Sequence, residues 1–367
     1  MSKYVNSKKK IILTIISIIL IILALSTIAI YMLFKTYLGK IESIMAESND
    51  TTLSDEEIMQ ELLAEEVVTD ASDSPEEDIA QLESQMEQQL EQQQKDQESN
   101  ETFADENEIF NILLVGYDSR KKGGVGRSDA MILISANGKT EKIHMTSIMR
   151  DSYVSIPGKG NNRINAAYAL GGGKLLLETI ETNFAVDVDK YVAFDFYSFV
   201  DIVDSIGGIE LEITEEELPF LNEYVRSLNR LYGRDEDAFI LEESGLQHLN
   251  GTQALGYARI RYVGNGDFER TERQRTVITK VFEKVKTMNL LEMNELINVF
   301  LPEIKTNLAE SEIVSLMFKV MTYLQYDLDS LRIPVEGSYN SMRVDGMAVL
   351  GIDLKKNQEA LAEFIGK

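Results

Sequence analysis

The 41 residues from Asn111 to Asp151 constrain the fold more than any other part of this 367-residue chain, because they hold three short apolar runs with charged residues at their ends. Runs of this length and apolar content are typical of buried β-strands. The charged residues that flank them are Asp118, Arg127, Asp129, Arg150 and Asp151. The stretch therefore predicts a sheet whose charged groups gather where strands begin and end.

An Asn137-Gly138 dipeptide separates the second run from the third, and Asn-Gly is the strongest short-range signal for a β-hairpin. An antiparallel hairpin brings Asp129, at the start of the second strand, close to Arg150, at the end of the third. If the loop after Asp118 reverses the chain, Asp118 lies at the same edge of the sheet. Two carboxylates and several arginines at one edge suit a divalent metal and phosphate oxygens.

Residues 11–34 form an apolar run without charge, preceded by Lys3, Lys8, Lys9 and Lys10. At about 1.5 Å per residue, a helix of this length spans roughly 36 Å, enough to cross a hydrocarbon core of about 30 Å. The run predicts a single transmembrane helix rather than a cleaved signal peptide, which would have a shorter apolar region and a small-residue cleavage site. The lysines place residues 1–10 in the cytoplasm and the chain after the helix outside the cell membrane.

Residues 41–106 contain 22 acidic residues and a single lysine, so most of the net charge of −25 belongs to this segment. Its composition cannot bury enough apolar surface to fold alone, and we interpret it as a largely disordered extracellular linker. A weak repeat of Ile79, Leu82, Met86 and Leu90 leaves a short helix as the alternative there.

Residues 107–367 alternate strand-like and helix-like segments, which indicates an extracellular α/β domain. Because the first hairpin is antiparallel, we expect a mixed central sheet with helices on both faces. The segment 152–173 has the turn residues of a loop followed by a short helix. Further helices are expected at 174–184 and 198–205 and near Phe268 and Met293, and late strands at 330–335 and 342–344.

A second charged cluster spans Ala254–Arg275. Arg259 and Arg261 are two residues apart, so an extended chain would point both to one face. In the helix expected to follow them, the apolar stripe continues backwards through Gln274 and Arg270, which should point inward. An inward arginine needs a carboxylate or an anionic ligand as its partner.

Simpler interpretations stay open for single residues. Arg259 and Arg261 also suit ordinary ion pairs, and Arg273 suits a solvated helix surface. His144, in a strand, and His248, in a polar loop, do not have the surroundings of catalytic groups. The chain has no cysteine, which excludes disulfides, thiolate metal sites and cysteine nucleophiles.

Seven motifs carry these residues in a fixed order: NILLVGYDSR, GRSDAMIL, SIMRDSYVSIPG, RINAAYALGG, YVAFDFYSFVDIVDSIGGIELEI, GLQHLNGTQALGYARIRY and DFERTERQR. In this order they resemble the LytR-CpsA-Psr family of cell-wall polymer ligases, over about residues 108–360. One departure is Met149, where the family usually has proline. The Arg150-Asp151 pair that follows is kept, so we expect only a local effect on the backbone.

The resemblance implies a membrane-anchored phosphotransferase that moves an anionic glycopolymer, such as teichoic acid or capsular polysaccharide, from a polyprenyl-pyrophosphate carrier to a muramic acid hydroxyl of peptidoglycan. Polyprenyl phosphate would leave, and its long tail would require an apolar tunnel between sheet and helices. By match to the family's motifs, Asp118 and Asp129 would bind Mg²⁺. The residues that would hold the pyrophosphate are Arg127, Arg150, Arg259, Arg261, Arg270 and Gln274, of which all but Arg127 are also candidates for catalysis.

The resemblance leaves the general base open among Asp118, Asp151 and Asp267. A hydrolase of polyprenyl pyrophosphate and a non-catalytic module that binds lipid-linked polymer are the alternatives, although two retained acids favour a metal enzyme over a binding module. An outward domain without a basic helix would not bind nucleic acid. We also expect the ligand to be the partner of Arg150 and Arg261, so that removing either costs little stability.

Overall fold

The computed structural model describes residues 80, 81, 83–85, 88, 109–119, 126–188 and 190–367. The predicted cytoplasmic segment 1–10 and transmembrane helix 11–34 lie outside the described residues. Within the described part of the chain, no helix is long and apolar enough to cross a membrane. Of the predicted linker 41–106, the residues described from 80 to 88 are helical, which is the alternative that the repeat of Ile79, Leu82, Met86 and Leu90 left open.

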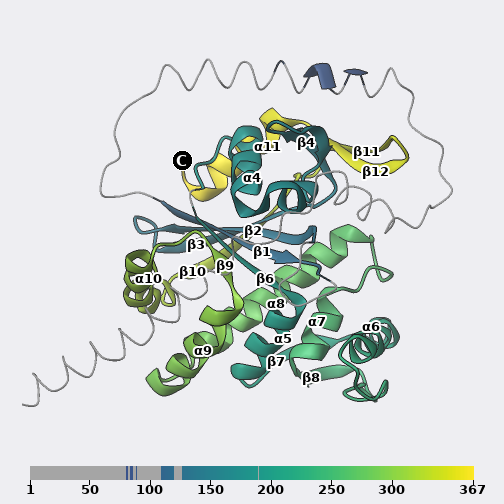
Figure 1. Cartoon of the computed structure of the whole chain (residues 1–367), viewed down its shortest axis with the longest axis vertical. Helices are drawn as coiled ribbons and strands as arrows, with labels where there is room; N and C mark the ends of the chain where they lie inside the picture. Colours follow the sequence, from purple (N-terminus) through teal and green to yellow (C-terminus); the bar gives the residue numbers. More distant parts are fainter. Residues whose placement is uncertain (1–79, 82, 86–87, 89–108, 120–125, 189) are drawn as a thin grey trace, which may run out of the picture. The chain divides into compact units, whose positions relative to one another are not determined.

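The predicted mixed sheet is confirmed as a six-stranded sheet with strand order β10-β3-β2-β1-β6-β9 (Figure 1). β1 pairs antiparallel with β2 and β2 with β3, whereas β1 runs parallel to β6 and β10 parallel to β3. Asn137 ends β2 and Gly138 lies in the turn that follows, so the predicted hairpin is also confirmed. The strands are β1 (Phe110–Tyr117), β2 (Ser128–Asn137), β3 (Lys142–Ile148), β6 (Lys190–Asp195), β9 (Lys305–Thr306) and β10 (Asp327–Ile333).

One edge of this sheet receives the ends of several strands. β1 and β6 are parallel and end opposite one another, at Tyr117 and Asp195. β2 begins at Ser128, which pairs with Tyr117. β3 ends nearby at Ile148, because it returns antiparallel to β2. Asp118, Asp129 and Arg150 therefore follow or begin strands at the same edge.

A smaller second sheet contributes residues to the same cavity as this edge. Its order is β11-β12-β4-β5, formed by β4 (Ser152–Ile156), β5 (Gly160–Arg163), β11 (Tyr339–Val344) and β12 (Met347–Ile352). The sequence predicted only one of its strands, the late strand at 342–344, which is confirmed within β11.

The loop predicted in the first part of 152–173 was wrong, because β4 and β5 form a short hairpin whose Tyr153 and Val154 are buried. The short helix predicted after it is confirmed as the first part of α4 (Ala166–Phe184), which is kinked at Gly171 and Gly172. β4 also pairs with β12, almost 200 residues away in the chain, at Ser152 and Leu350.

Helices cover both faces of the central sheet, as Figure 1 shows. On one side, α4 (Ala166–Phe184) and α11 (Leu354–Ile365) pack with the second sheet around one apolar core. On the other side, a second core lies among α5 (Phe196–Ser205), α6 (Leu218–Leu231), α7 (Gly251–Ala258), α8 (Asp267–Lys286) and the hairpin of β7 (Ile209–Ile213) and β8 (Gly245–Leu249). α9 (Leu290–Glu303) and α10 (Glu310–Tyr323) complete the chain between α8 and β10.

Candidate functional site

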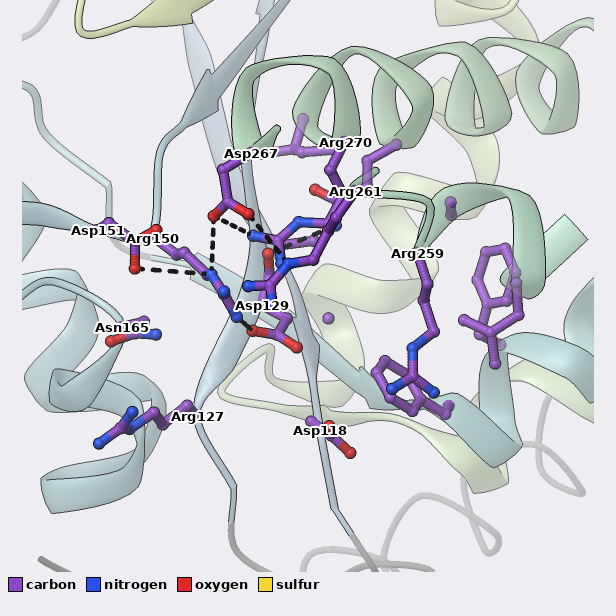
Figure 2. A pocket seen from close by; sticks show the side chains of 18 of the residues that line it. Asp118, Arg127, Asp129, Arg150, Asp151, Asn165, Arg259, Arg261, Asp267 and Arg270 are labelled. Carbon is purple, nitrogen blue, oxygen red and sulfur yellow. Dashed lines mark hydrogen bonds and ion pairs between the residues drawn. The ribbon is translucent and has the colours of Figure 1, made fainter. Parts of the chain in front are cut away.

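A cavity of about 960 Å³ opens at the edge where β1 and β6 end and β2 begins. This volume is near the upper end of the roughly 300–1,000 Å³ typical of ligand pockets. All eight residues predicted to bind the pyrophosphate or Mg²⁺ line it: Asp118, Arg127, Asp129, Arg150, Arg259, Arg261, Arg270 and Gln274. Figure 2 labels all of them except Gln274. The structure therefore brings both charged clusters to one cavity, while the roles assigned to these residues stay predictions.

A close approach of two backbone segments places Asp118 in the wall. The Asp118 amide donates to the carbonyl of Arg127 over 3.0 Å. Gly126 lies against the same turn, where an added Cβ would stand 1.5 Å from the Asp118 carbonyl oxygen. A side chain at position 126 would therefore force apart the strand ends that carry Asp118 and Asp129.

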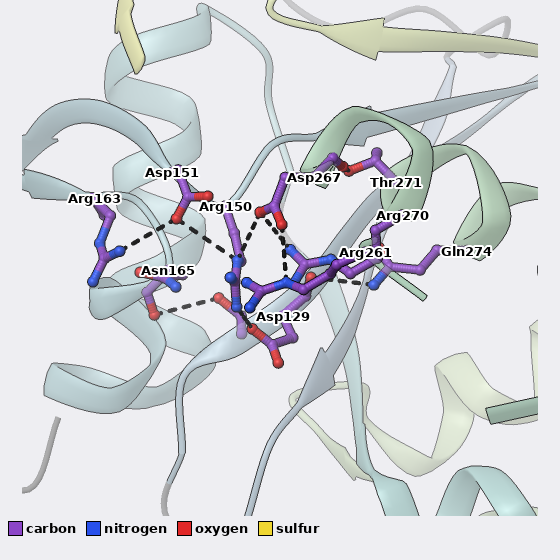
Figure 3. Close-up of polar contacts among 11 residues, drawn as sticks. Asp129, Arg150, Asp151, Arg163, Asn165, Arg261, Asp267, Arg270, Thr271 and Gln274 are labelled. Atoms are coloured by element: carbon purple, nitrogen blue, oxygen red, sulfur yellow. Dashed lines mark hydrogen bonds and ion pairs between the residues drawn. The ribbon is translucent and has the colours of Figure 1, made fainter. Parts of the chain in front are cut away.

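A carboxylate that the sequence suggested only as a general base, Asp267, holds three arginines together (Figure 3). Its two oxygens accept hydrogen bonds from Arg150 at 3.1 Å, Arg261 at 3.1 Å and Arg270 at 2.8 Å. Asp267 is the first residue of α8, and Arg270 follows one turn later on the same helix. One fixed acid thus spaces three guanidinium groups around the cavity.

Arg150 is the most heavily paired of the arginines. Besides Asp267, its guanidinium donates to the Asp129 carboxylate and lies 3.7 Å from Asp151. Burial lowers the pKa of Arg150, but the three carboxylates together raise it above its ordinary value. The expectation that only a ligand pairs with Arg150 or Arg261 was therefore wrong, because protein carboxylates already do so.

Three buried acids of the cavity, Asp129, Asp151 and Asp267, fall into two electrostatic classes. Burial raises the pKa of Asp129 and Asp267, but the neighbouring arginines outweigh it and hold the pKa of both carboxyls below the usual value. Asp151 differs, because burial dominates and the nearby Asp267 adds to it, which raises the pKa of Asp151 to about 6. Asp151 is thus the acid whose protonation changes closest to neutral pH among these three.

Arg270 carries donors that protein groups do not fully satisfy. Its side chain is 6% exposed and its Nε is buried without a hydrogen-bond partner among the described residues. Burial and the repulsion of Arg150 lower the pKa of Arg270. A buried guanidinium with a spare donor beside a second cation favours the binding of an anion.

Arg259 and Arg261 reach the cavity by a different route from the one the sequence suggested. They do not lie on a strand: Arg259 caps α7 with helical backbone angles, and buried Ile260 separates it from Arg261. The Arg259 guanidinium lies over the rings of Phe196, at 4.6 Å, and Tyr224, at 5.6 Å. Its planar cation is therefore held by aromatic faces, a contact that leaves its N–H edge able to bind phosphate.

The same cavity has an apolar wall between the sheet and the helices of the second core. The wall residues come from β1, β2, β6, α5, α7 and α8: Leu114, Ile132, Phe194, Phe196, Phe199, Leu255, Ala258, Val277 and Ile278. A ligand that filled the whole cavity would therefore be charged at one end and apolar at the other.

The polar residues of the wall that sequence reasoning missed include Arg163, Asn165 and Arg343. Arg163 ends β5 and lies 3.5 Å from Asp151. The sequence feature that could have identified Arg163 is the RINAAYALGG motif, in which a lone arginine and an asparagine precede an apolar helix. Arg343 belongs to the β11–β12 hairpin, whose approach to the cavity depends on the pairing of β12 with β4, and no local pattern indicates that pairing.

The structure also shows the surroundings of Arg273 and of the two histidines. The solvated surface suggested for Arg273 was wrong, because its side chain is 6% exposed and pairs with Glu217 at 2.8 Å. His144 is buried in β3 against Phe364, and His248 is exposed on β8. Neither histidine lines the cavity.

Comparisons with known proteins agree with the fold and with the family resemblance. The LytR_cpsA_psr family model matches residues 77–364. The chain is 31% identical over 258 residues to the regulatory protein MsrR of Staphylococcus aureus, which is 70% of this chain and 74% of MsrR. It is 33% identical over 210 residues to the polyisoprenyl-teichoic acid–peptidoglycan teichoic acid transferase TagU of Enterococcus faecalis, which is 56% of this chain and 63% of TagU.

Solved structures show the same architecture. TagT bound to LI-WTA superposes with a TM-score of 0.57 at 25% identity, over 73% of this chain and 95% of TagT. The family match covers most of the chain and includes every element that lines the cavity. The chain therefore belongs to the LytR-CpsA-Psr family.

Proposed function

We propose that this protein is a phosphotransferase that attaches an anionic glycopolymer to peptidoglycan from a polyprenyl-pyrophosphate carrier. The observation that carries the proposal is the single cavity in which an arginine cluster adjoins an apolar wall, because the donor is a pyrophosphate joined to a long hydrocarbon. The similarity to TagU, a transferase by name, supports the same reaction. The proposal places residues 1–10 in the cytoplasm, a membrane helix at 11–34 and the catalytic domain outside the cell.

The arginines would act on the pyrophosphate by binding and by stabilising developing charge. Arg150, Arg261 and Arg270 are already spaced by Asp267, and Arg259 is held by aromatic rings. Preorganised donors of this kind lower the barrier because they need not move as charge grows on the leaving phosphate. Arg127 and Gln274 line the same wall and would complete the clamp, the set of residues that would bind the pyrophosphate: Arg127, Arg150, Arg259, Arg261, Arg270 and Gln274.

The donor set at the cavity fits Mg²⁺. Asp118 and Asp129 both line the wall, and the arginines keep Asp129 ionised, as a metal ligand must be. Among the described residues, no three Asp, Glu or His side chains form a metal cage. Magnesium commonly takes one or two carboxylates and completes its shell with phosphate oxygens and water. When bound, the metal would neutralise charge on the pyrophosphate.

Asp151 is the best of the three candidates for the general base. Asp267 is tied to three arginines, and their positive charge makes it a weak proton acceptor. Asp151 lines the cavity beside Arg150, with a pKa of about 6. A base with a pKa near the working pH combines the ionised form with useful proton affinity.

We expect kcat/KM for transfer to rise with pH and to level off above about 6, because Asp151 accepts a proton only when it is ionised. Asp151→Asn should lower kcat about 100-fold and remove this limb of the pH profile. Asp353→Asn is a matched control, because Asp353 caps α11 away from the cavity. A limb near pH 6 that persists in Asp151→Asn would assign the proton transfer to another group.

The function is tested with the full chain in detergent, lipid-linked polymer, Mg²⁺ and a peptidoglycan acceptor. Covalent polymer on the glycan, abolished by EDTA and by Asp118→Asn, would support the proposal. Release of polymer phosphate at the same rate with or without acceptor would identify a hydrolase instead. Binding of lipid-linked polymer without any turnover would identify a non-catalytic module.

A further inference from the structure

An aromatic ring stands exposed at the cavity without a role in the clamp. Tyr262 follows Arg261 in the loop between α7 and α8, is 74% exposed and lines the cavity. Its ring lies against that of Phe220 on α6, with centroids 6.0 Å apart and planes inclined by 34°. Tyr262 is the most exposed of the large hydrophobic side chains in the described part of the chain. Exposed aromatic surface that adjoins a pocket is typical of a binding site.

The backbone of the loop that carries Tyr262 is held by hydrogen bonds from a buried side chain. The buried guanidinium of Arg273 donates to the carbonyls of Ile260 and Val263, each at 3.3 Å, on either side of Arg261 and Tyr262. Glu217 holds Arg273 in turn at 2.8 Å. Because the backbone on both sides is fixed, the exposed ring is held in a defined position. Binding of a ligand would therefore cost little conformational entropy of the loop.

The surroundings of the ring are polar as well as aromatic. Tyr224 lies one helical turn from Phe220 and also lines the cavity. Burial raises the pKa of Tyr224, Tyr262 raises it further, and the charges of Arg259 and Arg270 oppose them, so its hydroxyl lies within the field of the clamp. Ring faces, phenol hydroxyls and guanidinium groups together suit a ligand with a flat apolar face and several hydroxyls.

A pyranose ring has this chemistry, because its axial C–H groups form an apolar face and its hydroxyls surround it. A hydrocarbon tail is better matched by the apolar residues of the same cavity, which include Leu114, Phe199 and Ile278. The acceptor in the proposed reaction is a sugar whose hydroxyl must reach the phosphate held by Arg261.

We propose that Tyr262 and Phe220 form the subsite for the acceptor glycan and stack against one of its sugar rings. The inference rests on the proposed function for the identity of the glycan as acceptor. It assigns the sugar-binding step to the α7–α8 loop and the face of α6, and it separates acceptor binding from pyrophosphate binding within one cavity.

The test measures the binding of two probes to the full chain in detergent: a β-1,4-linked tetrasaccharide of peptidoglycan glycan, and inorganic pyrophosphate with Mg²⁺. Tyr262→Ala and Phe220→Ala should each weaken tetrasaccharide binding about tenfold and change pyrophosphate affinity less than about twofold. Tyr262→Phe should retain most tetrasaccharide binding, because the ring face remains. Leu246→Ala is the matched control, since Leu246 is 68% exposed on β8 and does not line the cavity.

Unchanged tetrasaccharide affinity in folded Tyr262→Ala protein would overturn the inference. Loss of binding to phosphatidylglycerol vesicles, with tetrasaccharide affinity kept, would overturn it in favour of a membrane contact. Failure of the proposed function gives a different result. If tetrasaccharide binding depends on Tyr262 but the protein transfers no polymer, the glycan site is supported and the ligase activity is not.

Discussion

Arg150→Met is expected to reduce polymer transfer by about 10³-fold or more and to lower the stability of the protein at neutral pH. The loss of transfer follows because Arg150 is the guanidinium common to both charged clusters of the cavity, and removing a preorganised donor to a developing charge has effects of this order. The loss of stability follows from its partners. Asp129, Asp151 and Asp267 would keep their negative charges close together without their shared cation.

The stability effect should depend on pH with a definite sign. Breaking a buried charge network costs about 3–5 kcal/mol, which corresponds to a fall in Tm of roughly 6–15 °C for a domain of this size. Without Arg150, the pKa of Asp129 and Asp267 rises toward and above the unfolded value. The difference in Tm between variant and wild type should therefore be largest near pH 7 and should shrink as the pH falls toward 5 and the acids take up protons.

Thermal unfolding from pH 5 to 8, in parallel with the transfer assay, checks this prediction. Arg226→Met serves as the control, because Arg226 forms an exposed pair with Asp237, and exposed pairs contribute little to stability. A variant of Arg150 that loses transfer but keeps the Tm of the wild type at every pH would show that the carboxylates are neutralised in another way. The expectation from sequence that removing Arg150 costs little stability would then hold.

The edge of the sheet that bears the site could be predicted because the information is local. Asn137-Gly138 determines the register of one hairpin, and that register places Asp129 near Arg150. The i, i+4 spacing of Arg270 and Gln274 on one helical stripe placed both in the cavity. In each case the relevant contact depends on residues only a few positions apart, or on one tight turn.

Other parts of the site depend on pairings between distant segments, which no local pattern encodes. β4 was missed because its five residues are followed by Pro157 and Gly158, which are typical of a turn, and its partner strand β12 lies near the end of the chain. Arg163 reaches the cavity only through that sheet. Asp267 was noted as one acid among several, since its contact with Arg150 joins residues 117 positions apart.

The burial of Arg273 is another feature that local sequence patterns could not predict. On the helical wheel it lies beside the apolar stripe of α8, a position that also suits a solvated arginine. Its burial comes from Glu217, which lies 56 positions earlier at the start of α6. The pair joins α6 to α8, and the same guanidinium donates to two carbonyls of the loop that presents Arg261 and Tyr262. Arg273 is thus a positioning residue that never touches the cavity itself.

Arg273→Met is expected to lower the free energy of unfolding by about 3–5 kcal/mol, because it leaves Glu217 charged and buried without its partner. Transfer should fall about 100-fold at temperatures where the variant is folded, since small displacements of a clamp residue have effects of this size. The second variant, Arg273→Met with Glu217→Gln, removes both charges. The amide oxygen of glutamine can still accept from Thr214, as Glu217 does at 3.1 Å.

The double variant separates the two roles of the pair. Most of the lost stability should return, because no unpaired charge stays buried, but transfer and pyrophosphate affinity should stay low, because Ile260 and Val263 still lack their donor. Lys142→Met with Asp329→Asn is the matched control, because the side chains of this pair are 43% and 45% exposed. It should change neither the stability nor the rate of transfer appreciably. Recovery of both transfer and stability in the double variant would show that Arg273 only balances the buried charge of Glu217. Transfer would then not depend on its hydrogen bonds to Ile260 and Val263.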